Sequence, residues 1–319
     1  PEPTPEPVAE RWDDDGELIL PAEFSEEQLQ FHASAVRGRD VYYWAIVPRP
    51  DKPGDTFPVL YLLHGAWGSH DDWRQHAKAD LKELAERYGV VIITPDGDPF
   101  GWYLDSPVEA ASQLETWFVQ ELIPHVEGSS RLPVMKGAEH RAIAGLSMGG
   151  YVAHAIMRRA PGRVTRLALI DTSARPDTPE QLERRRQLID MTRYGKFRVV
   201  TDRLLPILVH EARLSETELT NEIKKMSEHI GSEAFTRQQN AIMGRPDSRP
   251  FLMEYGVPTM VMCGRQDALT PPEHSQEMAV AIPGSRLAVI EDCGHLSTME
   301  RPQAATALMR QWLTYDQAA

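Results

Sequence analysis

The sequence predicts an α/β fold in which helices cover both faces of a mostly parallel central sheet, with a helical insertion late in the chain. Two observations predict this class. Short apolar runs typical of buried strands alternate with segments of helical spacing between residues 59 and 170. From residue 175 to residue 254 no buried strand is evident, and helical segments fill this interval before strands resume at residue 259.

The composition argues against several classes of protein. The 319 residues carry 34 Lys and Arg against 47 Asp and Glu, a net charge of −13, which argues against nucleic acid or an anionic membrane surface as the main partner. No run of about 18 apolar residues is present, so no membrane span is expected. The 11 histidines show no metal-ligand spacing, and no metal or cofactor is expected. The oligomeric state and the compartment, cytoplasmic or secreted, stay open.

The chain is expected to divide into a tail, a core and a cap. Residues 1–24 are rich in proline and acidic residues, which is typical of a disordered tail. Residues 25–174 and 255–319 are expected to form an α/β core, and residues 175–254 a helical cap above the sheet. The core patterns predict strands at 31–35, 40–47, 59–63, 90–94, 142–144, 164–170, 259–263 and 286–290, and helices at 77–88, 109–126, 151–160 and 301–313.

Four local features refine this picture. Pro124 is expected to kink the helix at 109–126 near its end. Thr178 and Gln181 form a capping box that starts a helix of the cap. The run at residues 184–186, three arginines, is interpreted as a solvated helix face. Cys263 and Cys293 are expected to be reduced core thiols, with a bridge between neighbouring strands as the alternative.

The motif that carries the functional hypothesis is Gly145-Leu-Ser147-Met-Gly149, a G-x-S-x-G. An apolar strand precedes it and a helix follows it, so it predicts a sharp strand-to-helix turn with Ser147 at the tip. Side chains at the two glycines would collide as the strand and helix close on each other. Serine alone is a poor nucleophile near neutral pH, so the hypothesis requires a base and an acid elsewhere in the chain.

Both partners are found just after later strands. Asp267 follows the strand at 259–263, and His295 follows the strand at 286–290. The carboxyl ends of parallel strands are where open α/β sheets place ligands. His295 would accept the proton of Ser147, and Asp267 would orient and stabilise the imidazole. Asp171, also at a strand end, is the rival acid, and His64 is interpreted as a structural residue that orders its loop.

An oxyanion hole is the fourth requirement. The backbone N–H of Met148 is one expected donor, and the second is expected from the turn after residues 59–63, from Ala66 or Trp67. Trp102 and Tyr103, in a long loop, could form a wall of the substrate pocket, with ordinary loop packing as the alternative.

The chain resembles the α/β-hydrolase superfamily of serine hydrolases in both halves. From residue 141 onward it is similar to the enol-lactonases and meta-cleavage-product hydrolases, through GLSMGGYVAHAIMRRAPGRVTRLALIDTSARPDTPEQ, CGRQDALTPP and EDCGHLSTMERP. The N-terminal half resembles the esterase branch of S-formylglutathione hydrolases and tributyrin esterases, through PVLYLLHGAWGSHDDW and ETWFVQELIPHVE. The resemblance implies the α/β-hydrolase fold and places Ser147, Asp267 and His295 on the catalytic positions.

The resulting hypothesis is a cofactor-independent serine esterase that cleaves short-chain carboxylic esters through an acyl-enzyme. Thioester hydrolysis, acyl transfer and carbon–carbon bond hydrolysis are alternatives on the same three residues. A catalytically silent binding protein with the same fold is the alternative from another class.

Overall fold

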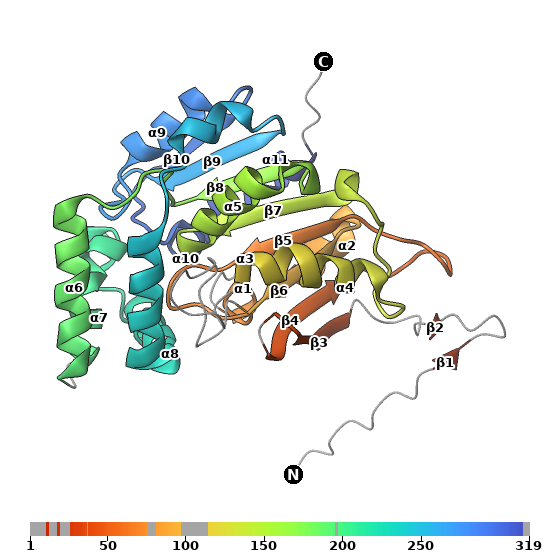
Figure 1. Cartoon of the computed structure of the whole chain (residues 1–319), viewed down its shortest axis with the longest axis horizontal. Helices are drawn as coiled ribbons and strands as arrows, with labels where there is room; N and C mark the ends of the chain where they lie inside the picture. The colour runs from red at the N-terminus through yellow and green to blue at the C-terminus, as the bar shows by residue number, and fades with distance from the viewer. Residues whose placement is uncertain are drawn as a thin grey trace, which may run out of the picture.

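The structure is a computed structural model that describes residues 11–12, 18–19, 26–36, 38–75, 81–96, 114–194 and 197–314. Its centre is an eight-stranded sheet in the order β10-β9-β8-β7-β5-β6-β4-β3 (Figure 1). The strands are β3 (Glu26–Ser34), β4 (Arg39–Val47), β5 (Val59–Leu63), β6 (Val91–Pro95), β7 (Arg141–Leu146), β8 (Arg166–Ile170), β9 (Thr259–Gly264) and β10 (Arg286–Ile290). Within this sheet only the β3–β4 and β4–β6 pairs are antiparallel. The predicted α/β architecture is therefore confirmed.

The central strands are apolar because both faces of the sheet are covered. All five residues of β5 are buried, and β6 and β9 are buried throughout as well. In the parallel pair of β5 and β7, Leu63 lies opposite Gly145. The turns that follow these two strands, which carry residues 64–68 and Ser147, therefore leave the same edge of the sheet side by side.

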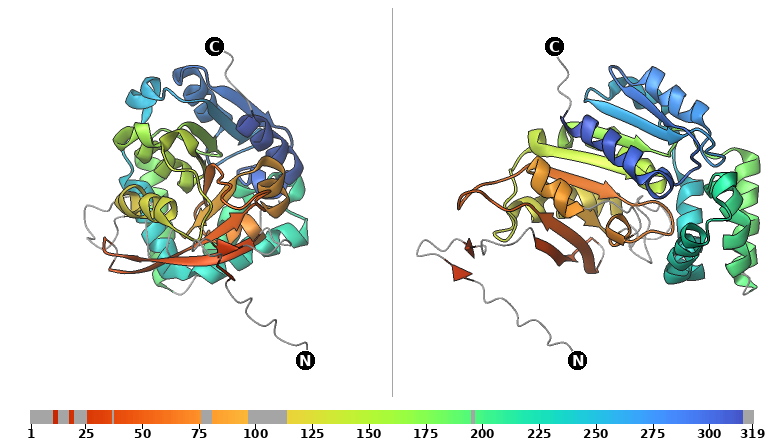
Figure 2. Two further views of the ribbon diagram at one scale, coloured as in Figure 1. Left: turned by 90° about the vertical axis from the view of Figure 1, so that its right-hand side faces the viewer. Right: turned by 180° about the vertical axis from the view of Figure 1, so that it is seen from behind.

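Helices form one layer on each face of the sheet (Figures 1 and 2). One face packs against α3 (Leu114–Trp117), α4 (Ile123–Gly128), α5 (Met148–Arg159) and α9 (Pro272–Ala281). The other face packs against α1 (Asp72–Gln75), α2 (Leu81–Tyr88) and α11 (Pro302–Thr314). Short α10 (Ser297–Glu300) precedes α11. Each layer buries its own apolar cluster, so the sheet is the shared wall of two cores.

The helix predicted at 109–126 is described from Leu114 onward, and its end differs from the prediction. Between α3 and α4 the chain forms a π-helical turn, Phe118–Leu122, which the sequence did not predict. Pro124 follows two residues later and lacks the N–H that an α-helix would use, so a widened turn before it avoids a clash with the preceding carbonyl. The turn still directs Phe118 and Leu122 into the core.

Residues 179–254 form the helices α6 (Pro179–Arg193), α7 (Phe197–Leu208) and α8 (Thr217–Gly244), followed by a 3-10 turn, Arg249–Glu254. We call α6, α7 and α8 the helical segment. Helix α6 starts at the expected capping box, and α8 bends at Gly231, whose φ is 78°. The segment shares an apolar cluster with core residues Trp67, Leu269 and Met299, so it packs directly on the loops that leave the sheet.

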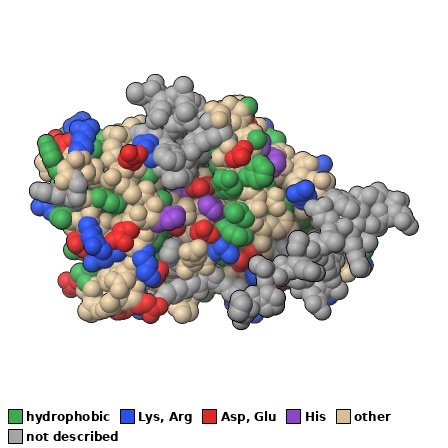
Figure 3. Space-filling view, turned by 90° about the horizontal axis from the view of Figure 1, so that it is seen from below, with side chains coloured by type: hydrophobic (Ala, Val, Ile, Leu, Met, Phe, Trp, Pro, Cys, Tyr) green, Lys and Arg blue, Asp and Glu red, His purple; other side chains and the backbone are tan. Residues whose placement is uncertain are grey.

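Within residues 1–24 the structure describes only β1 (Arg11–Trp12) and β2 (Leu18–Ile19), which pair antiparallel. The rest of the predicted tail lies outside the described residues. At the β3 edge of the sheet, Leu29, Phe31 and Tyr42 are exposed, and Figure 3 shows hydrophobic side chains on that side of the molecule. No described helix is both long enough and apolar enough to span a bilayer. Both cysteines are buried free thiols, as expected.

Candidate active site

Ser147 lies at the tip of the turn between β7 and α5, in a strained backbone conformation. Its φ is 51° and its ψ is −111°, and its N–H donates to the carbonyl of Ile170 at 2.8 Å. The flanking glycines are needed for space. A Cβ on Gly145 would lie 2.3 Å from the carbonyl oxygen of Gly149, and a Cβ on Gly149 would lie 2.3 Å from that of Leu63. The backbone therefore closes tightly around the serine and holds its side chain at the strand end.

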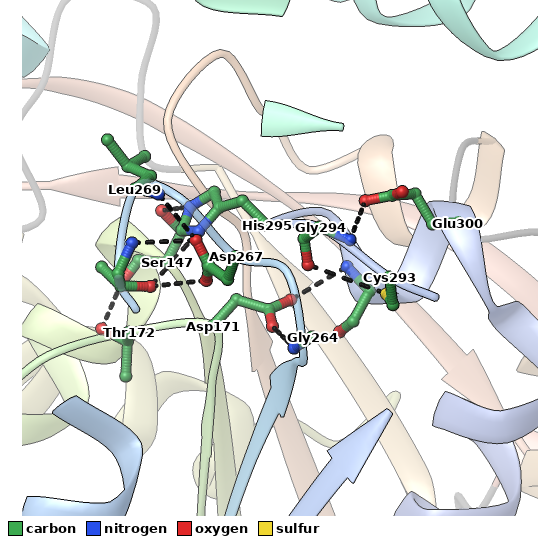
Figure 4. Close-up of polar contacts among 12 residues, drawn as sticks. Ser147, Asp171, Thr172, Gly264, Asp267, Leu269, Cys293, Gly294, His295 and Glu300 are labelled. Atoms are coloured by element: carbon green, nitrogen blue, oxygen red, sulfur yellow. Dashed lines mark hydrogen bonds and ion pairs between the residues drawn. The ribbon is translucent and has the colours of Figure 1, made fainter. Parts of the chain in front are cut away.

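The structure brings the three predicted side chains into one line of hydrogen bonds (Figure 4). Ser147 Oγ and His295 Nε2 are 2.8 Å apart, and His295 Nδ1 is 2.8 Å from Asp267 Oδ2. All three residues are buried, with exposed fractions of 8% for Ser147, 1% for His295 and 2% for Asp267. With Nδ1–H donated to the carboxylate, the other ring nitrogen is free to accept the serine proton.

Asp267 is held by its own loop. Its Oδ1 accepts the N–H groups of Leu269 at 2.9 Å and Thr270 at 2.8 Å, and its Oδ2 accepts the Thr270 hydroxyl at 2.7 Å. Three donors plus the imidazole fix the orientation of the carboxylate. Sequence reasoning missed Thr270. The available signal was the position of Asp267 in a loop, where an Asp side chain commonly accepts the backbone N–H two residues later in an Asx turn.

Asp171, the rival acid, has a different role in the geometry. It accepts the N–H of Gly264 at 3.2 Å with Oδ1 and the N–H of Ser297 at 3.0 Å with Oδ2. Among the described residues it has no hydrogen bond to His295. Asp171 thus ties the end of β9 to the loop that carries the histidine, and burial together with the nearby charge of Asp267 raises its pKa.

Burial and charge act in opposite directions on His295. Burial by itself lowers the pKa of the imidazole, but the carboxylates of Asp267 and Asp171 outweigh it, so the net pKa is raised above 6.5. The charged, imidazolium form of His295 is therefore stabilised although the side chain is buried.

The loop that carries the histidine is anchored by Glu300, which sequence reasoning also missed. Glu300 Oε1 accepts the N–H of Gly294 at 3.0 Å, and Oε2 accepts the N–H of His210 at 2.9 Å. The N–H of His295 itself donates to the carbonyl of Leu208, the last residue of α7, at 2.9 Å. The histidine loop and the end of α7 therefore hold each other in place.

The structure places the predicted oxyanion donors unequally. Met148 is the first residue of α5, where a backbone N–H has no partner within the helix. The N–H of Trp67, in contrast, donates to Gln238 Oε1 of α8 at 3.0 Å, and Trp67 has a positive φ of 69°. That leaves the N–H of Ala66 as the one of the two predicted turn donors without an acceptor among the described residues.

A cleft of about 1050 Å³, counting the part open to solvent, surrounds Ser147 and His295. Its walls come from both sides of the molecule: Ala66, Trp73 and Leu146 from the core, and Leu188, Leu208 and Ile223 from the helical segment. Most of the lining is apolar, as in small-molecule sites. Trp102 and Tyr103, predicted for the pocket wall, lie outside the described residues.

The arginine run at residues 184–186 was predicted to be a solvated helix face, and the structure differs from this prediction at Arg185. Arg186 is exposed and 3.8 Å from Glu183. Arg184 and Arg185 both line the cleft. Arg185 is only 13% exposed, and it donates to Asp177 and to Gln239 of α8. The interpretation was wrong for Arg185 because its buried partner lies eight positions earlier, in a loop that periodicity does not reveal.

His64 lies at the start of the turn after β5, which also carries Ala66 and Trp67. Its Nδ1 is 2.8 Å from the carbonyl of Gly65, and burial lowers its pKa to about 4. It therefore stays neutral at ordinary pH, in keeping with a loop-ordering role. Among the described residues no cluster of three or more His, Cys, Asp or Glu side chains could hold a metal ion.

These features match a known family. The model of the alpha/beta hydrolase family matches residues 60–307, and the chain belongs to that family. It is 24% identical over 258 residues to the sn-1-specific diacylglycerol lipase ABHD11 of Mus musculus, covering 78% of each protein. It is 25% identical over 277 residues to a 2-hydroxy-6-oxononadienedioate/2-hydroxy-6-oxononatrienedioate hydrolase of Pseudomonas putida, covering 82% of this chain and 90% of that protein.

A solved thermophilic esterase from Thermogutta terrifontis, bound to malate, is similar in structure. The TM-score is 0.71 at 28% identity, over 90% of this chain and 98% of the esterase. These relatives are hydrolases, an esterase among them, which is consistent with the resemblance seen in the sequence. The protein is accordingly an α/β-hydrolase-fold hydrolase.

Proposed function

We propose that the protein is a serine esterase that hydrolyses short-chain carboxylic esters through an acyl-enzyme, without a cofactor. The observation that carries the proposal is the hydrogen-bonded line from Ser147 through His295 to Asp267, buried at the bottom of an apolar cleft. A hydroxyl bonded to a neutral imidazole, which in turn is oriented by a fixed carboxylate, is the arrangement that acyl transfer requires.

The proposed reaction runs in two halves. His295 Nε2 takes the proton of Ser147 as Oγ attacks the ester carbonyl, and the developing oxyanion accepts the N–H groups of Met148 and Ala66. The protonated imidazole then gives its proton to the leaving alcohol. Water, deprotonated by the same histidine, attacks the acyl-serine. The bond between the acyl carbon and Ser147 Oγ breaks, the imidazolium returns its proton to Oγ, and the acid leaves. Asp267 keeps the imidazole in the required tautomer throughout.

Two variants test the proposal directly. Ser147→Ala is expected to abolish the burst of p-nitrophenol from p-nitrophenyl acetate or butyrate and to lower kcat by about four to six orders of magnitude. Ser173→Ala is the matched control. Ser173 is also buried, but its hydroxyl oxygen accepts the N–H of Arg175 at 3.1 Å, so this variant is expected to keep the burst. A fluorophosphonate probe should label the folded protein at Ser147. Full turnover in Ser147→Ala would overturn the proposal, and absence of labelling would favour a catalytically silent binding protein.

The helical segment is proposed to act as the cap of this site, with residues 175–254 as one division of the chain and residues 25–174 and 255–319 as the other. The contribution of Leu188 and Ile223 to the cleft wall supports this division. Thioester hydrolysis and acyl transfer use the same three residues. An acyl-glutathione substrate tests the first, and product analysis with added alcohol tests the second.

Carbon–carbon bond hydrolysis is a second candidate, and one observation favours it. Arg184 and Arg185 line the cleft, and guanidinium groups suit a substrate that carries a carboxylate. Turnover of 2-hydroxy-6-oxononadienedioate, the substrate in the name of the Pseudomonas relative, tests this reaction. If it exceeds ester turnover, and Arg184→Gln lowers it selectively, the carbon–carbon reaction replaces the esterase as the main function.

A further inference from the structure

A second cavity, which the proposed chemistry does not use, lies on the α2 and α11 face of the sheet. It measures about 610 Å³, counting space open to solvent. Leu60 and Leu62 of β5 and Ile92 of β6 line it from the sheet, and α2 and α11 line it from the helix layer. The right-hand view of Figure 2 places the orange α2 and the dark blue α11 on the same face. We call this space the α2–α11 cavity.

The chemistry of its lining suits an aliphatic chain. Leu84 from α2 and Ala305, Met309 and Leu313 from α11 add further apolar walls. Arg310, a charged group of the lining, has its guanidinium 5.7 Å from the ring of Tyr88 and is exposed. A chain of methylene groups would gain from leaving water here, whereas a charged or strongly polar ligand would find few partners.

The cavity meets the catalytic cleft at a shared wall. Trp73 and Thr298 line both spaces. Trp73 belongs to α1, is 6% exposed, and its indole N–H has no hydrogen-bond partner among the described residues. Among the described residues only packing holds the ring, so none of the hydrogen bonds described there has to break for it to turn aside.

We propose that the α2–α11 cavity receives the distal part of a medium-length aliphatic chain of an ester bound at Ser147, and that the Trp73 ring is the partition the chain displaces. The proposal deepens the proposed function and rests on it. It extends the substrate class from short-chain esters to medium-chain esters. Trp73 is then a specificity residue, which sets how long a chain the cleft admits.

The ratio of kcat/KM for p-nitrophenyl octanoate to that for p-nitrophenyl acetate tests the partition. Each methylene moved from water to apolar surroundings is worth about a fourfold gain in binding. Trp73→Ala is expected to raise the ratio by about tenfold or more, and Trp73→Phe, which keeps most of the wall, by much less. An unchanged ratio in Trp73→Ala would overturn the proposal.

Filling the cavity from its far side tests occupancy in the natural protein. Ala305→Leu adds bulk to a wall of the α2–α11 cavity alone and is expected to lower the octanoate-to-acetate ratio about tenfold. Ala304→Leu, the same change at the exposed neighbouring position of α11, should leave the ratio unchanged. If Ala305→Leu does not fold, Leu84→Trp fills the same space from α2. Equal ratios in the filling and control variants contradict the proposal.

Direct binding separates this inference from the esterase proposal. Decanoate should bind the folded Ser147→Ala protein, measured by calorimetry, and the Ala305→Leu substitution should weaken that binding. If no ester is hydrolysed but decanoate binds in this way, the esterase proposal fails and the cavity stands. If esters are hydrolysed but decanoate does not bind, the cavity proposal fails alone. Comparing p-nitrophenyl octanoate with octyl acetate identifies whether the acyl or the alcohol chain enters.

Discussion

Asp267 and Asp171 are carboxylates at the ends of neighbouring strands, and their hydrogen bonds differ. Asp267 binds the His295 imidazole, whereas Asp171 accepts two backbone N–H groups. Asp267→Asn would keep its carbonyl oxygen on the N–H groups of Leu269 and Thr270, and would turn its amide toward His295. The imidazole would then be held in the wrong tautomer, so kcat should fall by about 10⁴-fold. Steady-state kinetics on p-nitrophenyl butyrate measures this loss.

Asp171→Asn is the matched comparison. One of its two buried N–H partners, on Gly264 or Ser297, would lose its acceptor, so unfolding free energy should fall by about 1–3 kcal/mol while kcat falls far less than in Asp267→Asn. Urea unfolding alongside the same kinetic assay separates the two effects. A larger kinetic loss in Asp171→Asn would reverse the assignment of the acid.

The pH dependence follows from His295. Only the neutral imidazole can accept the serine proton, so kcat/KM should fall as pH drops through the pKa of His295. Burial lowers that pKa, but the nearby carboxylates, Asp267 foremost, raise it by more than burial lowers it. The net pKa is raised from 6.5, so the fall in kcat/KM on the acidic side, the acidic limb of the profile, should be centred above pH 6.5. In residual activity of Asp267→Asn the limb should move to lower pH. A limb in the natural protein well below 6.5 would show that burial outweighs the carboxylates.

Asp72 gives a stability prediction at the edge of the cleft. Burial raises its pKa from 3.8 to about 8, so between these values the unfolded chain carries the charge and the folded protein holds the proton. This contribution to stability is present below pH 3.8 and is lost as pH rises toward 8. Asp72→Asn removes this pH-dependent loss of stability. The Tm of the variant minus the Tm of the natural protein should therefore increase between pH 3.8 and pH 8, measured by thermal unfolding monitored by circular dichroism. A constant difference would contradict the assignment.

At the scale of elements, the serine turn depends on how closely β5, β7 and α5 approach. Gly149→Ala would force a Cβ to 2.3 Å from the Leu63 carbonyl, a backbone atom that cannot move aside. We expect a loss of about 2–3 kcal/mol in unfolding free energy and a misplaced nucleophile. Gly162→Ala, where nothing lies within 4 Å of the added carbon, is the control in the same urea titration and should be near neutral.

The link between α8 and the turn at residues 64–68 is a second element-scale feature. Gln238 accepts the N–H of Trp67 across 171 residues of sequence. Gln238→Leu should leave that N–H unpaired and let the turn relax, lowering kcat about tenfold or more with a smaller effect on KM. Ser227→Ala removes a buried bond to Thr201 inside the helical segment, 2.7 Å long, and should leave kcat unchanged. Equal kinetic losses in both would indicate general loosening.

For the molecule as a whole, the shared cluster around Trp67, Leu269 and Met299 means that the helical segment has no separate core. We therefore expect one cooperative unfolding transition, with far-ultraviolet circular dichroism and tryptophan fluorescence changing together. Two resolved transitions would mean that residues 175–254 fold independently. The proposed division into core and cap would then be a division into true folding units.

The sequence predicted the sheet well because strands buried on both faces read as short apolar runs, as in residues 59–63. It predicted the serine turn because a strand, a G-x-S-x-G and a helix follow one another in the sequence. Glycines at 145 and 149 leave the space that the strand and the helix need to close on each other. It could not reveal Gln238 or Glu300, since their partners lie 171 and 90 residues away and neither residue breaks a local pattern. The burial of Arg185 was missed for the same reason, because it depends on Asp177 and Gln239, which are its neighbours in space.

The bonds between the histidine loop and the end of α7 constrain how this protein could be recombined with its relatives. Replacing the helical segment by that of another hydrolase would remove the Leu208 carbonyl that receives the N–H of His295. It would also leave one oxygen of Glu300 without the His210 N–H. A chimera would therefore retain a working imidazole only if the transplanted helix presented a carbonyl and an N–H at those two places.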